Sequence, residues 1–202
     1  YKQYVIKEYF ADYFLHNSDV TFDLSTNEMQ VHDKKGENWK VTILDTGLNT
    51  MTGGRVLRAK QYLENERFLL TYGDGVADVD LNALLAFHEQ HGGIATMTTV
   101  SLAQQKGVLE KDDKGQILAF REKNDEDAAI INGGFMVLEP KVFDYLEGDA
   151  TVLEQEPMRK LAAEGQLFGY AHDGFWQCMD TQREKEKLET LWDEDKAPWK
   201  RW

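Results

Sequence analysis

The sequence contains almost no cysteine and little proline. Cys178 is the single cysteine among 202 residues, so no disulfide can form within the chain, as is typical of the reducing cytoplasm. Three prolines interrupt the chain, and no apolar run approaches the roughly 20 residues that cross a bilayer. We therefore expect a cytoplasmic protein without a membrane partner.

The chain is also poor in positive charge. It has 23 Lys and Arg residues against 36 Asp and Glu residues, which gives a formal net charge of -13 at pH 7. Nucleic-acid binding needs a broad basic face, and this balance argues against it. An acidic protein that handles phosphorylated small molecules must concentrate positive charge locally, through a few Lys or Arg side chains or a bound cation.

Apolar runs and helical patterns alternate along the chain. Residues 68–72 form a short apolar run that predicts a buried parallel strand, residues 80–91 have helical spacing, and residues 94–100 are β-branched. Asp80 and Gly92 are suited to cap the helix between the two strands. This order predicts an α/β fold with a mixed, mainly parallel sheet flanked by helices.

The length favours one domain, or one domain with a small appendage. The chain begins at Tyr1 and runs directly into a helical pattern, so we expect that upstream residues have been removed. Further helices are expected within residues 1–15, 55–63, 142–146, 153–163 and 182–192, and further strands at 20–22, 29–31, 39–44, 117–121, 135–138 and 167–170.

Two aspartates follow apolar stretches. Asp74 comes after the run at 68–72, and Asp180 ends a second stretch just before a predicted helix. Ligands bind at the carboxyl ends of strands in open parallel sheets, and Mg²⁺ takes one or two carboxylates together with water and substrate phosphates. Taken singly, Asp-Gly is ordinary turn chemistry and Asp180 is a good helix N-cap. As a pair they predict a Mg²⁺ site.

Two segments are candidates for phosphate binding. Thr52-Gly53-Gly54-Arg55 leads into a helix, where backbone amides can hold phosphate and Arg55 can clamp it, although the same residues also make an ordinary capped loop. Lys123, after the strand at 117–121, is a second candidate, against the alternative of a solvated surface lysine.

Two further segments suit a sugar ligand. Asn132-Gly133-Gly134 lets an amide and the backbone approach a ligand closely, and Glu154-Gln155-Glu156 offers acceptors for hydroxyl groups. The alternatives are a bulge or turn for the first segment, and an acidic first helical turn for the second. The five histidines show no metal-ligand spacing.

These motifs form an ordered series that is similar to a known enzyme family. They are Asp45-Thr46-Gly47, Met51-Thr52-Gly53-Gly54-Arg55, Tyr72-Gly73-Asp74-Gly75-Val76-Ala77-Asp78, Ile131-Asn132-Gly133-Gly134-Phe135, Glu154-Gln155-Glu156-Pro157, Phe175-Trp176-Gln177 and Met179-Asp180-Thr181. With these motifs the sequence resembles the glucose-1-phosphate cytidylyltransferases over nearly its whole length, including a C-terminus that is similar at residues 196–200.

The resemblance implies a Rossmann-like nucleotidyltransferase fold and a Mg²⁺-dependent reaction. CTP and α-D-glucose 1-phosphate would give CDP-glucose and pyrophosphate, for the deoxysugars of surface polysaccharides such as lipopolysaccharide. The sugar phosphate would attack the α-phosphorus in line, without a covalent enzyme intermediate. We also expect a homo-oligomer.

The resemblance also implies roles for individual residues. Asp74 and Asp180 would hold Mg²⁺, Lys123 would meet the sugar phosphate, Thr50, Arg55 and Gly73 would lie on the nucleotide side, and Asn132, Gly133, Glu156 and Trp176 would form the glucose side.

The sequence departs from the family pattern in three places. Residues 104–108 stand where an Arg-aromatic-Gly segment is expected, and Asn124 stands where proline is expected after Lys123. The N-terminal strand, its glycine-rich loop and a basic Lys-Pro segment do not occur. Residues 1–202 are therefore expected to be the C-terminal portion of the nucleotidyltransferase domain, unstable and inactive without the upstream part.

Two other functions compete with this interpretation. Asp78-Val79-Asp80 matches the Asp-x-Asp metal motif of glycosyltransferases that use nucleotide sugars. The third alternative is a noncatalytic module of the same fold that binds nucleotide sugars.

Replacing Lys123 tests the sugar-phosphate assignment. Lys123→Ala is expected to raise the KM for glucose 1-phosphate more than the KM for CTP, because a lysine paired with a phosphate dianion contributes about 2 kcal/mol, or roughly thirtyfold. Steady-state kinetics with each substrate varied in turn measure the difference. An equal effect on both substrates, or no effect, removes Lys123 from the sugar side.

Overall fold

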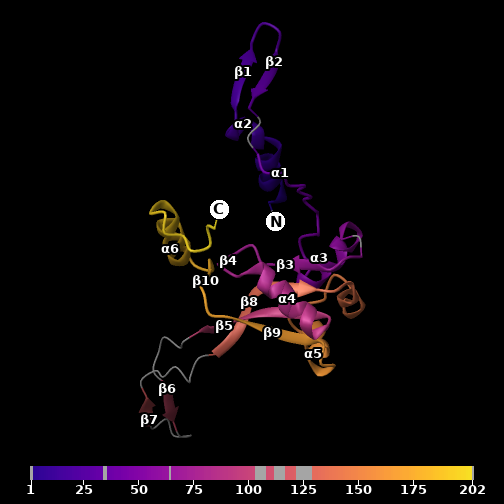
Figure 1. The fold of residues 1–202 in the computed structure, drawn as a ribbon, viewed down its shortest axis with the longest axis vertical. Coiled ribbons are helices and arrows are strands. Elements are labelled where there is room, and N and C mark those ends of the chain that lie inside the picture. The colour runs from indigo at the N-terminus through magenta and orange to yellow at the C-terminus, as the bar shows by residue number, and fades with distance from the viewer. Residues whose placement is uncertain are drawn as a thin grey trace. The chain divides into compact units, whose positions relative to one another are not determined.

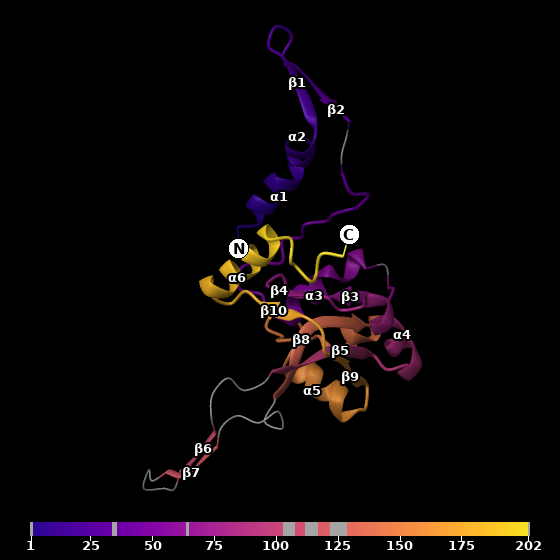
Figure 2. The ribbon, with the colours of Figure 1, turned by 60° about the vertical axis from the view of Figure 1, so that its left-hand side comes forward.

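The computed structural model describes residues 2–33, 36–63, 65–102, 108–111, 117–121 and 129–201. Lys123, Asn124 and residues 104–107 lie outside them. The chain divides into two compact units, Tyr1–Thr50 and Met51–Trp202, and each is described by itself. Figures 1 and 2 label their elements.

The first unit consists of two short helices and a hairpin. Helix α1 (Gln3–Ala11) and helix α2 (Tyr13–Asn17) are followed by β1 (Asp19–Asp23), which pairs antiparallel with β2 (Glu28–His32). The two strands match the expectation, but the single helix expected over residues 1–15 is divided at Asp12, and residues 39–44 form no strand. No residue of either helix is buried, so this unit has little apolar core of its own.

The second unit is built on a four-stranded sheet with the order β3-β8-β5-β9. The parallel pair is β5 (Ala95–Leu102) with β9 (Leu167–His172), whereas β8 (Ala129–Leu138) runs antiparallel to both β5 and β3 (Phe68–Leu70). Three strands therefore share one direction and β8 opposes them, which confirms the mixed sheet.

The position of β3 corrects one expectation. The apolar run at 68–72 was predicted to be a buried parallel strand, but β3 is an edge strand and Leu69 is 47% exposed. Two separate antiparallel pairs complete the strands: β4 (Gly75–Ala77) with β10 (Trp176–Cys178), and β6 (Val108–Lys111) with β7 (Ile117–Arg121).

The helices of this unit begin and end where local chemistry allows. Helix α4 (Leu81–His91) starts at Asp80, whose carboxylate accepts the N–H groups of Asn82 and Ala83, and it ends at Gly92 with φ 64°. The helix expected at 182–192 is also confirmed, whereas the remaining predicted helices are shorter, are divided or have 3₁₀ geometry; the bounds of all of them follow. They are α3 (Thr52–Ala59), the 3₁₀ helices η1 (Lys60–Tyr62) and η3 (Pro140–Tyr145), α5 (Glu156–Ala163) and α6 (Gln182–Asp193).

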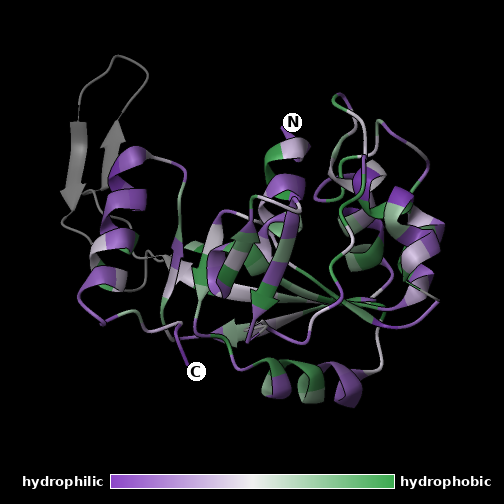
Figure 3. Cartoon of the chain, turned by 90° about the horizontal axis from the view of Figure 1, so that it is seen from above, coloured by the Kyte–Doolittle hydropathy of each residue, from purple (hydrophilic) through white to green (hydrophobic). Residues whose placement is uncertain are grey.

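The core lies between the sheet, η3 and α5. Met136 and Leu138 of β8 pack with Val142, Leu153 and Leu161, all of which are almost completely buried. In Figure 3, hydrophobic residues follow the central strands, and hydrophilic and hydrophobic positions alternate along the surrounding helices. This core makes the sheet a rigid base for the loops at its ends.

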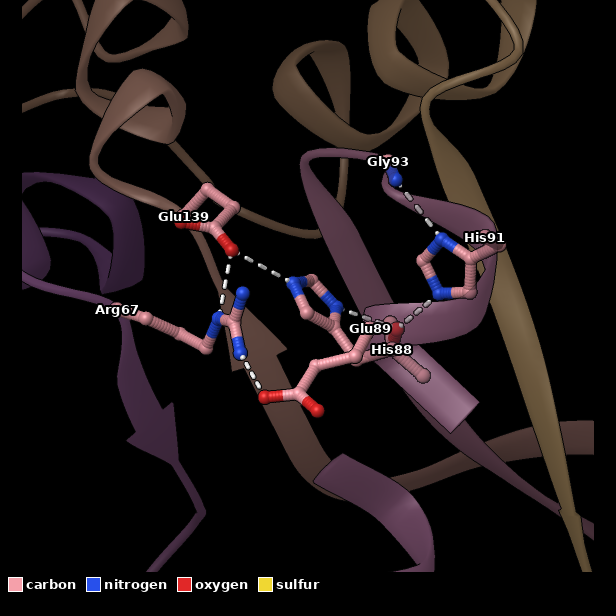
Figure 4. A network of polar contacts seen from close by, with 7 residues as sticks. Arg67, His88, Glu89, His91, Gly93 and Glu139 are labelled. Atoms are coloured by element: carbon pink, nitrogen blue, oxygen red, sulfur yellow. Dashed lines mark hydrogen bonds and ion pairs between the residues drawn. The ribbon is translucent and has the colours of Figure 1, made fainter. Parts of the chain in front are cut away.

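A line of polar contacts joins α4 to the sheet (Figure 4). The buried His88 contacts Thr96 Oγ1 through Nδ1 at 2.7 Å and Glu139 through Nε2 at 3.1 Å. His91 Nε2 reaches the same Thr96 oxygen at 2.7 Å, and Gly93 N–H donates to His91 Nδ1 at 2.9 Å. The residues are thus linked without interruption from Gly93 to Glu139.

The Gly93 amide sets the direction of the whole line. Because it donates to Nδ1, the neutral His91 ring carries its proton on Nε2 and donates to Thr96. Thr96 then donates its single hydroxyl proton to Nδ1 of His88, and the Nε2–H of His88 donates to Glu139. Protonating His91 on Nδ1 would place two donors face to face.

Stability is therefore expected to fall in mild acid. Burial, followed by the nearby His88, lowers the pKa of His91 below its ordinary 6.5. As the pH falls below 6.5, His91 takes up a proton in the unfolded chain before it does so in the folded protein. The free energy of unfolding therefore declines until the pH reaches the lower pKa of the folded state, and then levels off. Urea unfolding between about pH 7.5 and 5 measures this. A His91→Gln variant should show a smaller decline, and an unchanged decline would contradict the assignment.

Candidate functional site

A hollow of about 570 Å³ lies where three segments of the second unit meet. It contains six of the residues predicted from the sequence: Gly73, Asp74, Asn132, Gly133, Trp176 and Asp180. The remaining lining residues are Thr71, Tyr72, Gly75, Gly134 and Cys178.

A bulge in β8 forms one wall of the hollow. Met97 pairs with Met136 and Thr99 pairs with Asn132, so a single residue of β5 faces three residues of β8. Gly134 has φ +84°, and a Cβ there would lie 2.8 Å from the ring of Tyr72. The Gly133-Gly134 pair is therefore a β-bulge, as one interpretation of the sequence held, and it brings the main chain into the hollow.

The pairing of β4 with β10 forms the opposite wall. Cys178 pairs with Gly75, and Met179 N–H donates to the carbonyl of Asp74 at 2.8 Å. Trp176 Nε1 donates to the carbonyl of Gly133 at 2.8 Å, which ties β10 to the bulge. Segments about 100 residues apart are thereby held at fixed separations.

Asp74 and Asp180 lie at neighbouring ends of this pair. Asp74 directly precedes β4 and Asp180 follows β10, and the two strands are antiparallel. The N-cap of α6 is Thr181, whose hydroxyl accepts Glu184 N–H, so Asp180 does not serve as the cap. Both carboxylates are exposed to the hollow, and carboxylate oxygens are ligands that Mg²⁺ prefers. Each of the two residues therefore offers the type of ligand that Mg²⁺ takes.

A second set of potential ligands overlaps this one. Cys178 Sγ and the carboxylates of Asp180 and Glu184 lie within 4.8 Å of one another. Burial, followed by the hydrogen bond to Asp180, raises the pKa of the Cys178 thiol, and sulfur is a poor ligand for Mg²⁺. Glu184 is engaged with Thr181 in the capping box of α6. The oxygens of Asp74 and Asp180 are the better match for Mg²⁺.

A chain of side-chain hydrogen bonds runs behind the bulge. Thr52 and Tyr72 both contact the Glu154 carboxylate, at 2.6 Å and 2.5 Å, and Asn132 Nδ2 lies 3.3 Å from the Tyr72 oxygen. Burial, followed by Glu154, raises the pKa of Tyr72. The sequence interpretation gave no role to Tyr72 or to Glu154 by itself. The signal for both was their place in the motifs at 72–78 and 154–157.

Three predicted site residues lie elsewhere. Glu156, in the first turn of α5, is 3.6 Å from Arg159 and lines a separate hollow of about 420 Å³. Thr50 is buried at the end of the first unit, and Arg55 lies inside α3. Among the described residues, none of these three lines the hollow of Asp74.

The glycine-rich segment is not a free phosphate cradle. The N–H groups of Gly53 and Gly54 both donate to the carbonyl of Thr151, at 2.9 Å and 3.2 Å. A Cβ on Gly53 would lie 2.8 Å from the Thr151 side chain, so glycine is needed for close packing. The amides expected to bind phosphate are therefore used within the protein.

Both carboxylates of the Asp78-Val79-Asp80 motif make contacts within the protein. Asp80 caps α4. Asp78 Oδ1 accepts Phe175 N–H at 2.7 Å and lies 3.2 Å from His172, while Oδ2 lies 3.1 Å from Arg201. The two carboxylates thus serve different partners, which argues against a shared glycosyltransferase metal site.

A family model described as nucleotidyl transferase matches residues 4–178. The chain belongs to this nucleotidyl transferase family. Within the family it is 53% identical over 203 residues to a glucose-1-phosphate cytidylyltransferase of Salmonella typhi, and 45% identical to a probable glucose-1-phosphate cytidylyltransferase of Bacillus subtilis. Each alignment covers 100% of this chain and 79% of the relative.

Solved structures share the nucleotidyltransferase fold. A putative glucose-1-phosphate thymidylyltransferase from Bacillus anthracis, in complex with a sucrose, superposes with a TM-score of 0.55 at 16% identity, over 72% of this chain and 62% of that one. HddC from Yersinia pseudotuberculosis gives 0.52 at 17% identity, over 69% and 61%. This chain therefore spans less than two thirds of either structure. None of the described helices is long and apolar enough to span a membrane.

The contacts of Asp78 predict a large effect on stability. Asp78→Ala removes the acceptor for Phe175 N–H and the partner of His172 and Arg201. A loss of about 2 kcal/mol in the free energy of unfolding is expected, because a donor in a largely buried place loses its acceptor. Urea unfolding measures it, with Asp173→Ala at a nearby exposed position as the control. Equal stability of the two variants would show that the Asp78 contacts contribute nothing.

Proposed function

We propose that the protein transfers the cytidylyl group of CTP to α-D-glucose 1-phosphate, with Mg²⁺, and releases pyrophosphate and CDP-glucose. The observation that carries the proposal is the meeting of Asp74 and Asp180 at one hollow with Asn132, Gly133 and Trp176. The two relatives that are 53% and 45% identical over the whole of this chain are named as a glucose-1-phosphate cytidylyltransferase and a probable one. These names support CTP and glucose 1-phosphate as substrates.

The two carboxylates suit the charge problem of this reaction. A sugar phosphate and a nucleoside triphosphate are both anions, and a chain with net charge -13 repels them unless local cations compensate. Asp74 and Asp180 would hold Mg²⁺, which supplies charge neutralisation at the phosphates. Lys123 and Arg55, as the family resemblance implies, would add positive charge around the substrates.

The bulge of β8, together with Trp176 of β10, suits the neutral part of the substrate. Asn132 offers amide hydrogen-bonding groups, and the glycines of the bulge let the main chain approach a ring closely. Trp176, held by its hydrogen bond to Gly133, would limit the width of the hollow. We assign the phosphates to the carboxylates beside β4 and β10, and the hydroxyl groups to the bulge and Trp176.

With both groups held, the reaction is a displacement at phosphorus. An oxygen of the sugar phosphate attacks the α-phosphorus of CTP in line, the bond to the β-phosphate oxygen breaks, and pyrophosphate leaves. Positioning and charge compensation account for the catalysis in this scheme. We further propose that the enzyme acts in the cytoplasm as a homo-oligomer and supplies CDP-glucose for lipopolysaccharide or related polysaccharides.

Substitution of the two aspartates tests the proposal. The assay supplies CTP, glucose 1-phosphate and Mg²⁺. Asp74→Asn and Asp180→Asn should each lower the rate of pyrophosphate release by about a hundredfold or more, because a bound metal ion stabilises the transition state by several kcal/mol. Asp193→Asn, at an exposed position in α6, is the matched control and should keep the wild-type rate.

The assay compares two forms of the protein. The 202 residues are tested alone and joined to the N-terminal part of the Salmonella typhi relative, of which this chain covers 79%. Substrate binding without turnover would support the noncatalytic module. Consumption of a nucleotide sugar only when an acceptor is added would support the glycosyltransferase. Turnover that survives both aspartate substitutions would overturn the proposed metal site.

A further inference from the structure

The series of side-chain hydrogen bonds that links Thr52, Glu154, Tyr72 and Asn132 has a defined donor-to-acceptor direction. An ionised carboxylate only accepts hydrogen bonds, so Thr52 and Tyr72 must both donate their hydroxyl protons to Glu154. Leu153 N–H donates to the Thr52 oxygen at 2.9 Å, which leaves the Thr52 proton for Glu154. The Tyr72 oxygen, having given its one proton away, is then only an acceptor.

The direction of this chain determines how the Asn132 amide is oriented. Nδ2 must face the Tyr72 oxygen, 3.3 Å away, because only the amide nitrogen can donate to it. On the other side Oδ1 accepts Gly134 N–H at 2.8 Å. A flipped amide would place oxygen against oxygen and N–H against N–H. Glu154 and the bulge therefore specify the same orientation from opposite ends.

The fixed amide presents a definite pattern to the hollow. Tyr72 accepts one N–H of Asn132, and Gly134 N–H donates to Oδ1. Within the part of the chain that the structure describes, this leaves one donor and one acceptor on a half-buried side chain. A sugar hydroxyl both donates and accepts, so two adjacent hydroxyls of a pyranose match this pattern. A phosphate oxygen, which only accepts, matches half of it.

The ring of Tyr72 is held separately from its hydroxyl. It packs against Gly134 so closely that a Cβ there would lie 2.8 Å from Cδ2. Tyr72→Phe therefore removes the hydrogen bonds of the hydroxyl and keeps the packing of the ring. Glu154 is an exposed member of the hydrogen-bond series, so Glu154→Gln removes its charge with little change in shape.

From these contacts we propose that Glu154 and Tyr72 are positioning residues, which orient the Asn132 amide for recognition of sugar hydroxyls. The proposal rests on the proposed function and deepens it, because it names the residues that set sugar selectivity without touching the reacting phosphates. It also replaces Glu156 by Glu154 as the acid of the segment 154–157 that acts on the sugar side.

Kinetics of Tyr72→Phe and Glu154→Gln test the proposal in the active protein. Each variant should raise the KM for glucose 1-phosphate about tenfold, since a misdirected amide loses about one hydrogen bond. The KM for CTP should stay within about twofold, and kcat within about threefold. The double variant should be no worse than either single variant, because both act through one amide.

The chain offers a matched control pair. Tyr145 donates to Glu164 at 2.5 Å, a hydrogen bond of the same kind away from this hollow. Tyr145→Phe and Glu164→Gln should leave both KM values unchanged. Selectivity gives a second readout, in which Tyr72→Phe should narrow the preference for glucose 1-phosphate over its monodeoxy analogues.

The outcomes separate this inference from the proposed function. If the wild type releases no pyrophosphate, the function fails, and calorimetric binding of glucose 1-phosphate to the same proteins decides the inference. Weaker binding by Tyr72→Phe and Glu154→Gln than by the control variants supports it. Equal binding by all variants, no binding by the wild type, or equal increases in both KM values overturn it.

Discussion

The short antiparallel pair of β4 with β10 is the constraint on which the site depends. Only three residues of each strand pair, yet the Met179 N–H bond to the Asp74 carbonyl extends the contact and places two carboxylates at neighbouring strand ends. Two like charges repel one another, so a side-chain contact alone would not keep them together. The backbone pairing places the two residues at neighbouring strand ends, and a cation bound between them would relieve the repulsion.

Asp78 reinforces this pair from its other end. The carboxylate binds the Phe175 amide and lies against His172 and Arg201, while Gly174 leaves no room for a side chain beside it. One acidic residue thus holds the strand pair in place, and another, Asp74, faces the hollow. Their sequence separation is four residues, but their environments assign them opposite tasks.

The sequence predicted the elements of the second unit well where the chemistry is local. Asp80 and Gly92 mark the ends of α4 because an N-cap and a left-handed C-cap depend only on nearby residues. It also brought Asp74, Asp180, Asn132, Gly133 and Trp176 to one site, through motif order and family resemblance. The edge position of β3 was not predicted, because an apolar run looks the same in a central and in an edge strand.

The misplaced residues show where pattern reasoning fails. Gly53 and Gly54 resemble a phosphate loop, but their amides bind the carbonyl of Thr151, about 100 residues away in the chain. Glu156 and Glu154 are two residues apart, and only the fold shows that Glu154 turns towards Tyr72. The roles of Arg55, Lys123 and Thr50 remain predictions, since they depend on substrates and on contacts that no local pattern determines.

The bulge in β8 has a consequence for how such a site can change over time. Part of the wall at Gly133 and Gly134 is main chain, and a side chain added at Gly134 would collide with Tyr72. Random substitution can therefore barely reshape this surface, and new variants must alter the side chains around it. Substitutions that change sugar preference are expected at Tyr72, Asn132, Glu154 and Trp176, whereas Gly133 and Gly134 are expected to tolerate little substitution.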